Sequence, residues 1–259
     1  MQQIVAQLLL PGEDTELSAI SPWLDLRVVP KETTLAAIEA QTHRRFIKSH
    51  LPVRALVYSP RAKYIYVARD GRDVVWSLHN HHAHGNDAWY AMLNDTPGRV
   101  GPPIEPPPAS VRDYFLAWLE RDGHPLWPFW EHVRGWWDIR HLPNLLMVHY
   151  ADLQADLTAE LRRIAAFLDI EVDECVWPTI LLHCSFEHMR RNGSRLIPAV
   201  ETFLYNGAQT LINKGTNGRW RDDLTAEDIS RYEQEARTRL GEACAAWLAD
   251  GGSTRNAAR

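Results

Sequence analysis

The sequence contains few cysteines, and none of them has a paired spacing. Only three occur among 259 residues, at Cys175, Cys184 and Cys244, and no two form a C-x-x-C motif. This scarcity argues against a disulfide framework and against a cysteine-ligated zinc site, and it fits a reducing compartment. We therefore expect a cytoplasmic protein.

The sequence also lacks long apolar runs and an excess of positive charge. Pro11 interrupts the first apolar stretch, and no basic segment or small-residue cleavage site accompanies it. We therefore predict neither a signal peptide nor a membrane span. The formal net charge is −5, which argues against broad nucleic-acid binding because that function needs a basic face. A local basic pocket for one small anion remains compatible with this charge.

The pattern of apolar residues predicts strands alternating with helices. The predicted strands cover residues 45–50, 63–68 and 144–150. Helices are predicted at 2–10, 71–82, 111–120, 129–139 and 157–168, within 175–189, and from a capping box at Thr225 to about Gly251. Residues 35–38 are predicted to form a short helix or a turn. This alternation predicts a parallel, doubly wound sheet in a single domain of residues 1–259, with a proline-rich loop at 98–108 and a frayed tail at 253–259.

The first candidate site lies in the segment Phe46-Ile47-Lys48-Ser49-His50. Lys48 and His50 are two residues apart, so an extended strand would present both side chains on one face. Leu51-Pro52 ends the run and places His50 at the carboxyl end of the strand, where open parallel sheets bind ligands. Taken alone, a lysine and a histidine at this spacing are more often exposed surface residues without a function.

A second basic residue follows the apolar run Tyr64-Ile65-Tyr66-Val67-Ala68. Arg69 ends this run, and Asp70 is expected to cap the following helix, with Asp73 at its third position. The amides of the first helical turn and the Ser77 hydroxyl then offer donors to an anion, and Arg69 adds a fixed charge. An Arg69–Asp73 ion pair without a functional role is the alternative interpretation.

A third segment near the C-terminal end contains closely spaced glycines. It is Asn213-Lys214-Gly215-Thr216-Asn217-Gly218-Arg219-Trp220. Glycines in a G-x-x-G spacing let backbone amides approach a phosphate without obstruction by a Cβ atom, and the preceding lysine supplies positive charge. Without other evidence, such a segment is equally compatible with an ordinary turn.

In this order, the three segments resemble the 3′-phosphoadenosine 5′-phosphosulfate (PAPS)-dependent sulfotransferases. That family has signatures of the form K-T-H-L-P, V-A-R-N-x-x-D-V-x-x-S and R-K-G-x-x-G-x-W. Two further segments are similar to its Y-E-D-L and T-S-F-x-x-M motifs, namely His149-Tyr150-Ala151-Asp152-Leu153 and Cys184-Ser185-Phe186-Glu187-His188-Met189. The resemblance implies an α/β fold in which helices flank a parallel sheet, related to the P-loop-containing nucleotide hydrolases.

The resemblance also implies a function, namely sulfuryl transfer from PAPS to a hydroxyl or amine of a small-molecule acceptor without a metal. It makes His50 the general base and assigns Lys48 to stabilising charge on the transferred group. The remaining matched residues are implied to bind the cofactor: Arg69, Ser77, Asn213, Lys214 and Gly215 at the 3′-phosphate, and Tyr150 and Phe186 at the adenine. The family has arginine where this chain has Asn213, and Arg191 or Arg195 are candidates to compensate.

One family motif has no counterpart here. The phosphate-binding loop P-K-S-G-T-T-W and its strand are missing, and Met1 begins a segment similar to the helix that follows them. A start codon upstream of Met1 and a shortened, inactive nucleotide-binding relative are the two explanations. A kinase of similar architecture is a further alternative. The family's dimerisation pattern is altered between Arg221 and Ser230, so the sequence predicts no oligomeric state.

Two other features allow alternative interpretations. The tract His79-Asn80-His81-His82-Ala83-His84 could bind a metal or line the acceptor pocket. Five tryptophans could likewise line an aromatic acceptor site or belong to the core: Trp118, Trp127, Trp130, Trp136 and Trp137. We expect pocket lining rather than metal binding for the histidine tract.

Overall fold

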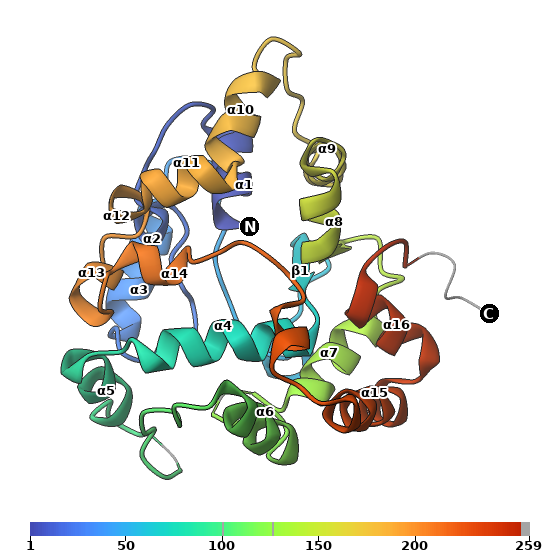
Figure 1. The fold of residues 1–259 in the computed structure, drawn as a ribbon. Coiled ribbons are helices and arrows are strands. Elements are labelled where there is room, and N and C mark those ends of the chain that lie inside the picture. The colour runs from blue at the N-terminus through green and yellow to red at the C-terminus, as the bar shows by residue number, and fades with distance from the viewer. Residues whose placement is uncertain (100, 126, 255–259) are drawn as a thin grey trace. The chain divides into compact units, whose positions relative to one another are not determined.

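The computed structural model describes residues 1–99, 101–125 and 127–254. Backbone packing divides the chain into two compact units, whose elements Figure 1 labels. Unit 1 contains Met1–His50, Asn80–Pro106 and Asp169–Gly215, and unit 2 contains Leu51–His79, Pro107–Leu168 and Thr216–Arg259. The boundary between His79 and Asn80 falls inside helix α4 (Gly71–Ala83).

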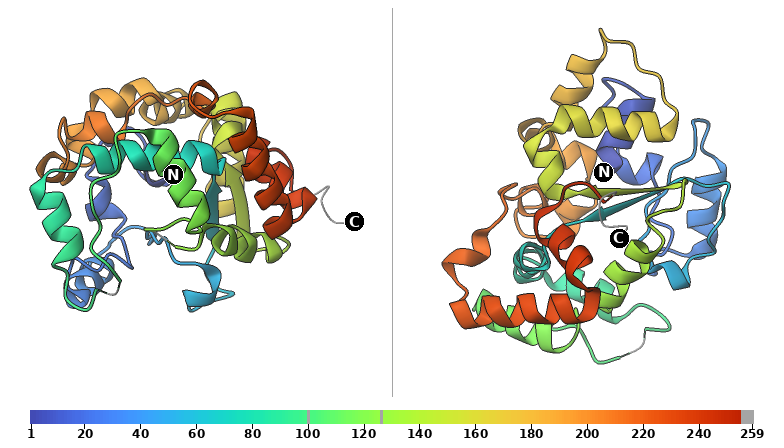
Figure 2. Two further views of the ribbon diagram at one scale, coloured as in Figure 1. Left: turned by 60° about the horizontal axis from the view of Figure 1, so that its bottom comes forward. Right: turned by 90° about the vertical axis from the view of Figure 1, so that its right-hand side faces the viewer.

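Unit 2 contains a two-stranded parallel sheet, visible in the right-hand view of Figure 2. Strand β1 (Tyr64–Ala68) pairs with β2 (Leu145–His149) along the whole length of both strands. In β1 the side chains of Tyr66 and Ala68 are buried while Val67 between them is exposed, as the alternation of a strand requires. The predicted α/β class with a parallel sheet is confirmed, and both strands lie within their predicted ranges.

The helices of unit 2 bury an aromatic core. They are η1 (Val53–Ala55), α6 (Val111–Glu120), α7 (Phe129–Asp138), α8 (Tyr150–Ala155), α9 (Leu157–Leu168), η2 (Arg219–Asp222), α15 (Ala226–Leu240) and α16 (Glu242–Asp250). Helix α15 packs against both α7 and α16 (Figure 1). Four of the five candidate tryptophans are core residues with 3–6% exposure, namely Trp118, Trp130, Trp136 and Trp137, whereas Trp127 is 42% exposed.

Unit 1 is built from short helices around a smaller core. They are α1 (Gln2–Leu9), α2 (Leu17–Ile20), α3 (Lys31–Glu39), α5 (Asp87–Asn94), α10 (Trp177–Cys184), α11 (Phe186–Arg191), α12 (Gly193–Leu196), α13 (Val200–Phe203) and α14 (Ala208–Leu211). Helix α1 packs against α10 (Figure 1), and the buried apolar cluster consists of Ala6, Leu17, Ile20 and Leu196. Within the described ranges, no helix of either unit is long and apolar enough to cross a membrane.

The predicted strand at 45–50 is wrong. Only Lys48 forms a bridge, parallel to Trp23, in which the Lys48 amide donates to the Pro22 carbonyl and the Leu24 amide donates to the Lys48 carbonyl. Two residues further on, the Asp25 carboxylate accepts the amide hydrogen of His50 at 3.1 Å. A side chain thus takes the place of the backbone acceptor that would have extended the ladder, and the pairing ends after one residue.

Several helix predictions needed correction as well. The helix predicted from Thr225 to Gly251 is two helices, because Gly241 adopts φ +78° between α15 and α16, a conformation that glycine adopts without strain. The capping box at Thr225 is confirmed. The segment 175–189 holds two helices separated at Ser185, α3 is longer than predicted, and α5 was not predicted. Of the predicted frayed tail, residues 255–259 lie outside the described part of the chain.

A buried ion pair fixes the start of α4 in unit 2. The Asp70 carboxylate accepts the Arg72 backbone amide at 2.8 Å and pairs with the Arg72 guanidinium at 2.7 Å. The guanidinium lies 3.8 Å from the ring centroid of Trp220 and 4.8 Å from that of Tyr232. The Tyr232 hydroxyl in turn accepts the amide hydrogen of Gly71. Asp70 therefore caps α4, as predicted, and its charge is balanced within the core.

We predict that Arg72→Ala lowers the free energy of unfolding by about 3–5 kcal/mol, because it leaves the Asp70 carboxylate buried without its partner. Denaturant unfolding of the purified variant measures this change. The control is Arg54→Ala, which breaks the exposed pair with Glu131 and should cost less than about 1 kcal/mol. Equal losses from the two variants would contradict the role assigned to the buried pair.

Candidate functional site

In unit 2, Arg69 lies directly between β1 and α4 and is anchored by the loop that follows Gly215. Its Nε donates to the Asn217 side-chain oxygen and a terminal nitrogen donates to the Thr216 carbonyl, both at 2.8 Å. The guanidinium stands 4.6 Å from the ring centroid of Tyr150. Two of the predicted cofactor residues, Arg69 and Tyr150, are therefore neighbours in unit 2, beside part of the glycine segment.

Asp73 ties the same loop to α4. One of its carboxylate oxygens accepts the Gly218 amide hydrogen at 2.8 Å and lies 3.9 Å from the Arg69 guanidinium. Gly218 adopts φ +81°, a left-handed conformation that glycine adopts without strain. Burial raises the pKa of Asp73, although the Gly218 amide and Arg69 oppose that shift. The Arg69–Asp73 ion pair, which was the alternative interpretation of these residues, thus exists at long range. It belongs to a larger set of contacts that includes the loop at Gly218.

Arg69 keeps hydrogen-bonding capacity after these contacts. A guanidinium carries five N–H donors, and the two bonds to the loop use two of them. Burial lowers the pKa of Arg69 from its ordinary value, opposed chiefly by Asp73, yet an arginine stays charged at neutral pH. The side chain is 23% exposed, so its remaining donors are partly open to a ligand. Ser77 lies in α4, about two helical turns after Arg69, and is half-buried.

In unit 1, Lys48 and His50 lie against the same tryptophan. The Lys48 Nζ is 4.1 Å from the ring centroid of Trp23, and the His50 imidazole is 4.6 Å from it. Burial lowers the pKa of Lys48, and the charge of Asp25 opposes this shift. Lys48 and His50 therefore both contact Trp23, although no strand aligns their side chains. Sequence reasoning missed Trp23 and Asp25, because neither forms a local pattern with residues 48–50.

Phe186 and Gly215 are also neighbours in unit 1. Gly215 has φ +65°, and a Cβ atom there would lie 2.6 Å from the Phe186 ring. The adjacent Asn213 carbonyl accepts a hydrogen bond from Arg190, while Lys214 is exposed. Arg190 thus contacts residue 213, at a position where sequence reasoning had suggested Arg191 or Arg195. It also lines a cavity of about 380 Å³, together with Asn80, His84, Asn206, Gln209, Thr210 and Asn213.

The histidines of the tract at residues 79–84 contact different parts of the protein. In unit 2, His79 bonds the Pro108 carbonyl at 2.8 Å and packs against Tyr114. In unit 1, His84 bonds the Asn80 carbonyl. The Nε2 atom of His81 is buried without a hydrogen-bond partner in the described part of the chain. Burial and the nearby charge of Lys48 lower the pKa of His81 to about 4.

The comparisons with known proteins come from sequences and from solved structures. Residues 1–243 match a family model described as "Sulfotransferase domain". A glycolipid sulfotransferase from Mycobacterium bovis is 30% identical over 96% of this chain and 84% of its own length. Human sulfotransferase 1C2 is 25% identical over 85% of this chain and 69% of its own length.

Solved structures share the fold. A retinol dehydratase in complex with androsterone and the inactive cofactor PAP gives a TM-score of 0.69 at 23% identity, covering 93% of this chain and 76% of that chain. A mouse sulfotransferase complexed with PAP gives a TM-score of 0.66 at 18% identity, covering 95% of this chain and 83% of that chain. The fold is therefore that of a sulfotransferase. With the family model matching nearly the whole sequence, the chain belongs to the sulfotransferase domain family.

We predict that His81 makes the fold sensitive to acid. Since its pKa is about 4 in the folded chain and about 6.5 when unfolded, only the unfolded chain takes up this proton as the pH falls below 6.5. The free energy of unfolding should then decrease by about 1.4 kcal/mol per pH unit between pH 6.5 and 4 from this group alone.

Denaturant unfolding of His81→Gln across that pH range measures the effect, and the variant should show a shallower decrease than the wild type. The control is His141→Gln, at an exposed position, which should keep the wild-type slope. An unchanged slope in His81→Gln would rule out the proposed titration.

Proposed function

We propose that this chain transfers a sulfuryl group from PAPS to a hydroxyl or amine of a small-molecule acceptor. The observation that carries the proposal is the environment of Arg69 in unit 2. Its guanidinium is held by Thr216 and Asn217 and stands beside the Tyr150 ring, and three of its N–H donors make no hydrogen bond to the described residues. A fixed positive charge next to an aromatic face suits an adenine nucleotide that carries an additional phosphate.

The other cofactor contacts follow the family motifs. We assign the 3′-phosphate to Arg69, Ser77, Asn213, Lys214 and Gly215, and the adenine to Tyr150 and Phe186. The positive φ of Gly215 and its close approach to Phe186 support a backbone role for that glycine, since a larger residue would displace the ring. The contact between Arg190 and the Asn213 carbonyl supports Arg190 as the source of the charge that Asn213 lacks.

The chemical step is assigned to Lys48 and His50. In this mechanism His50 removes the acceptor proton as the acceptor oxygen or nitrogen forms a bond to sulfur, and the bond between sulfur and the phosphate oxygen of PAPS breaks. Lys48 stabilises the negative charge that develops on the departing phosphate and the sulfonate. Contact of both side chains with Trp23, and the bond from the His50 amide to Asp25, support a fixed relative position for the two groups.

Three wider assignments rest on the free cysteines, on the names of relatives and on the family match. Because it runs through residues of both units, we propose that residues 1–259 act as one sulfotransferase domain. The name of the mycobacterial relative and the androsterone bound to retinol dehydratase suggest glycolipids and sterols as the first acceptors to test. We also propose a cytoplasmic location, which the three free cysteines support, since a reducing compartment keeps thiols unpaired.

We predict that His50→Ala lowers the turnover number by about 10²–10⁴-fold, because the acceptor proton then has no positioned base. Transfer from PAPS labelled in its sulfuryl group to a panel of glycolipid, phenol and sterol acceptors measures this loss. The control is Ser49→Ala, the adjacent exposed position, which should retain turnover close to wild type. Undiminished turnover in His50→Ala would remove that residue from the mechanism.

We predict that Arg69→Ala weakens binding of 3′-phosphoadenosine 5′-phosphate (PAP) by about 10–150-fold, equivalent to about 1.5–3 kcal/mol for lost bonds to a charged group. Binding of adenosine 5′-phosphate should change little, since that ligand has no 3′-phosphate. Calorimetric titration of both ligands distinguishes the two cases, with the exposed Arg61→Ala as the matched control. Equal losses for both ligands would refute a specific contact to the 3′-phosphate.

A further inference from the structure

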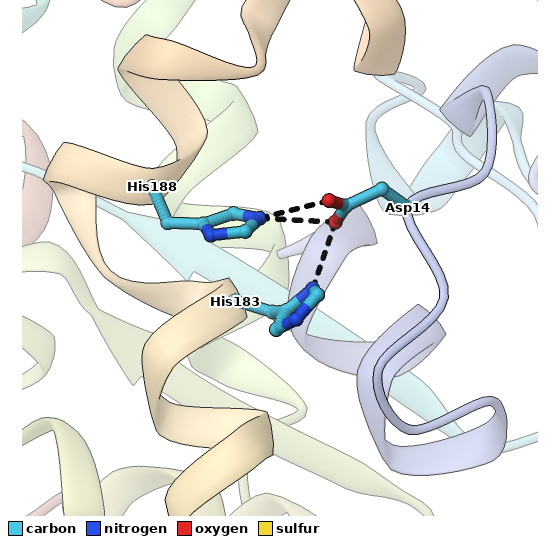
Figure 3. A group of neighbouring side chains, drawn as sticks. All are labelled: Asp14, His183 and His188. Atoms are coloured by element: carbon cyan, nitrogen blue, oxygen red, sulfur yellow. Dashed lines mark hydrogen bonds and ion pairs between the residues drawn. The ribbon is translucent and has the colours of Figure 1, made fainter.

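Three side chains of unit 1 that the proposed transfer does not use converge on one point (Figure 3). The Asp14 carboxylate lies between two imidazoles, 2.8 Å from His183 Nδ1 and 3.0 Å from His188 Nε2. Asp14 comes from the loop after α1, His183 from the last turn of α10, and His188 from α11. The cluster therefore joins three separate segments of the chain.

The environment of this cluster is unusual for charged groups. The three side chains are only 10–14% exposed, and the centroids of the two imidazole rings are 4.2 Å apart. Burial acts to raise the pKa of Asp14, but the hydrogen bonds from His183 and His188 outweigh it, and the pKa is lowered. The carboxylate is thus ionised, and its oxygens face one nitrogen of each imidazole ring.

The donor atoms themselves suit a metal ion. Imidazole nitrogens and a carboxylate are common ligands of divalent transition metals. The His188 Nε2 atom lies 3.1 and 3.0 Å from the two Asp14 oxygens, so both oxygens are close to the same imidazole nitrogen.

The distances also suit a metal ion. The three ligand atoms lie within 4.8 Å of one another. Tetrahedral coordination with metal–ligand bonds of about 2.0–2.1 Å separates neighbouring ligand atoms by about 3.3 Å. The two distances from Asp14 to the histidine nitrogens, 2.8 and 3.0 Å, differ from that separation by about half an ångström or less. Three protein ligands leave the fourth position for water, as the partial exposure of the site permits.

We propose that Asp14, His183 and His188 bind one divalent transition-metal ion of the Zn²⁺ class. Two imidazoles and one carboxylate favour zinc and its neighbours in the first transition row over Mg²⁺ and Ca²⁺, which take oxygen ligands. None of the three ligands is among the residues to which the sulfuryl transfer is assigned. Since Phe186 lies between the two histidines in sequence, the bound ion fixes the corner between α10 and α11 that carries this residue.

The test is calorimetric titration of the chelator-treated full chain with ZnCl₂. The expected result is one binding event per chain, with binding to Asp14→Asn and His183→Gln weakened by more than about 100-fold, since each loses a direct ligand. MgCl₂ should give no binding. The matched control is the double variant His81→Gln, His82→Gln in the histidine tract, which should bind Zn²⁺ as the wild type does.

A second measurement keeps the proposal testable if a variant unfolds. The visible absorption of Co²⁺ added to the wild-type chain should show the intense bands of a four-coordinate ion, and one equivalent of Zn²⁺ should abolish them. Absence of Zn²⁺ binding to the wild type, or its loss in the tract variant with retention in Asp14→Asn, would overturn the proposal. Neither readout depends on sulfuryl transfer, so the result is independent of the proposed function.

Discussion

The buried pair between Asp70 and Arg72 is the interaction on which unit 2 most depends. Burying two charges is favourable only when each has its partner and its hydrogen bonds, and here the guanidinium also packs between Trp220 and Tyr232. These contacts connect the end of β1 and the first turn of α4 to η2 and α15, segments that lie far apart in sequence. Arg69 immediately precedes Asp70 in the chain, so the ion pair also sets the backbone position of Arg69. The geometry of the candidate anion site is therefore a consequence of core packing.

Local sequence signals predicted most of the fold of unit 2. Both strands, helix α4 and the capping box at Thr225 depend on residues a few positions apart, and each was predicted correctly. The errors occurred where distant residues or one backbone angle decide the outcome. The strand expected at 45–50 is limited to one bridge because Asp25 captures the next amide. The last helix is divided because Gly241 adopts a positive φ, which a helical pattern does not reveal.

In the candidate site, too, residues in local motifs were predicted and their distant partners were not. The motif residues Lys48, His50 and Arg69 were identifiable because each belongs to a short stretch that resembles a family signature. Their supporting partners were not identifiable, because Trp23 is 25 residues from Lys48 and Asn217 is 148 residues from Arg69. The separations leave no periodic or capping pattern to recognise. The sequence thus identifies the charged side chains. The structure shows which residues hold those side chains in place and which N–H donors are left to bind a ligand.

A crystal structure of this chain with PAP bound would decide whether Arg69 holds the 3′-phosphate. We expect the 3′-phosphate to accept hydrogen bonds from the terminal nitrogens of Arg69 and from Ser77, while Thr216 and Asn217 keep their bonds to the same guanidinium. We also expect the adenine to lie beside Tyr150. PAP bound elsewhere on the chain, or bound here with its 3′-phosphate directed away from Arg69, would refute the assignment of Arg69.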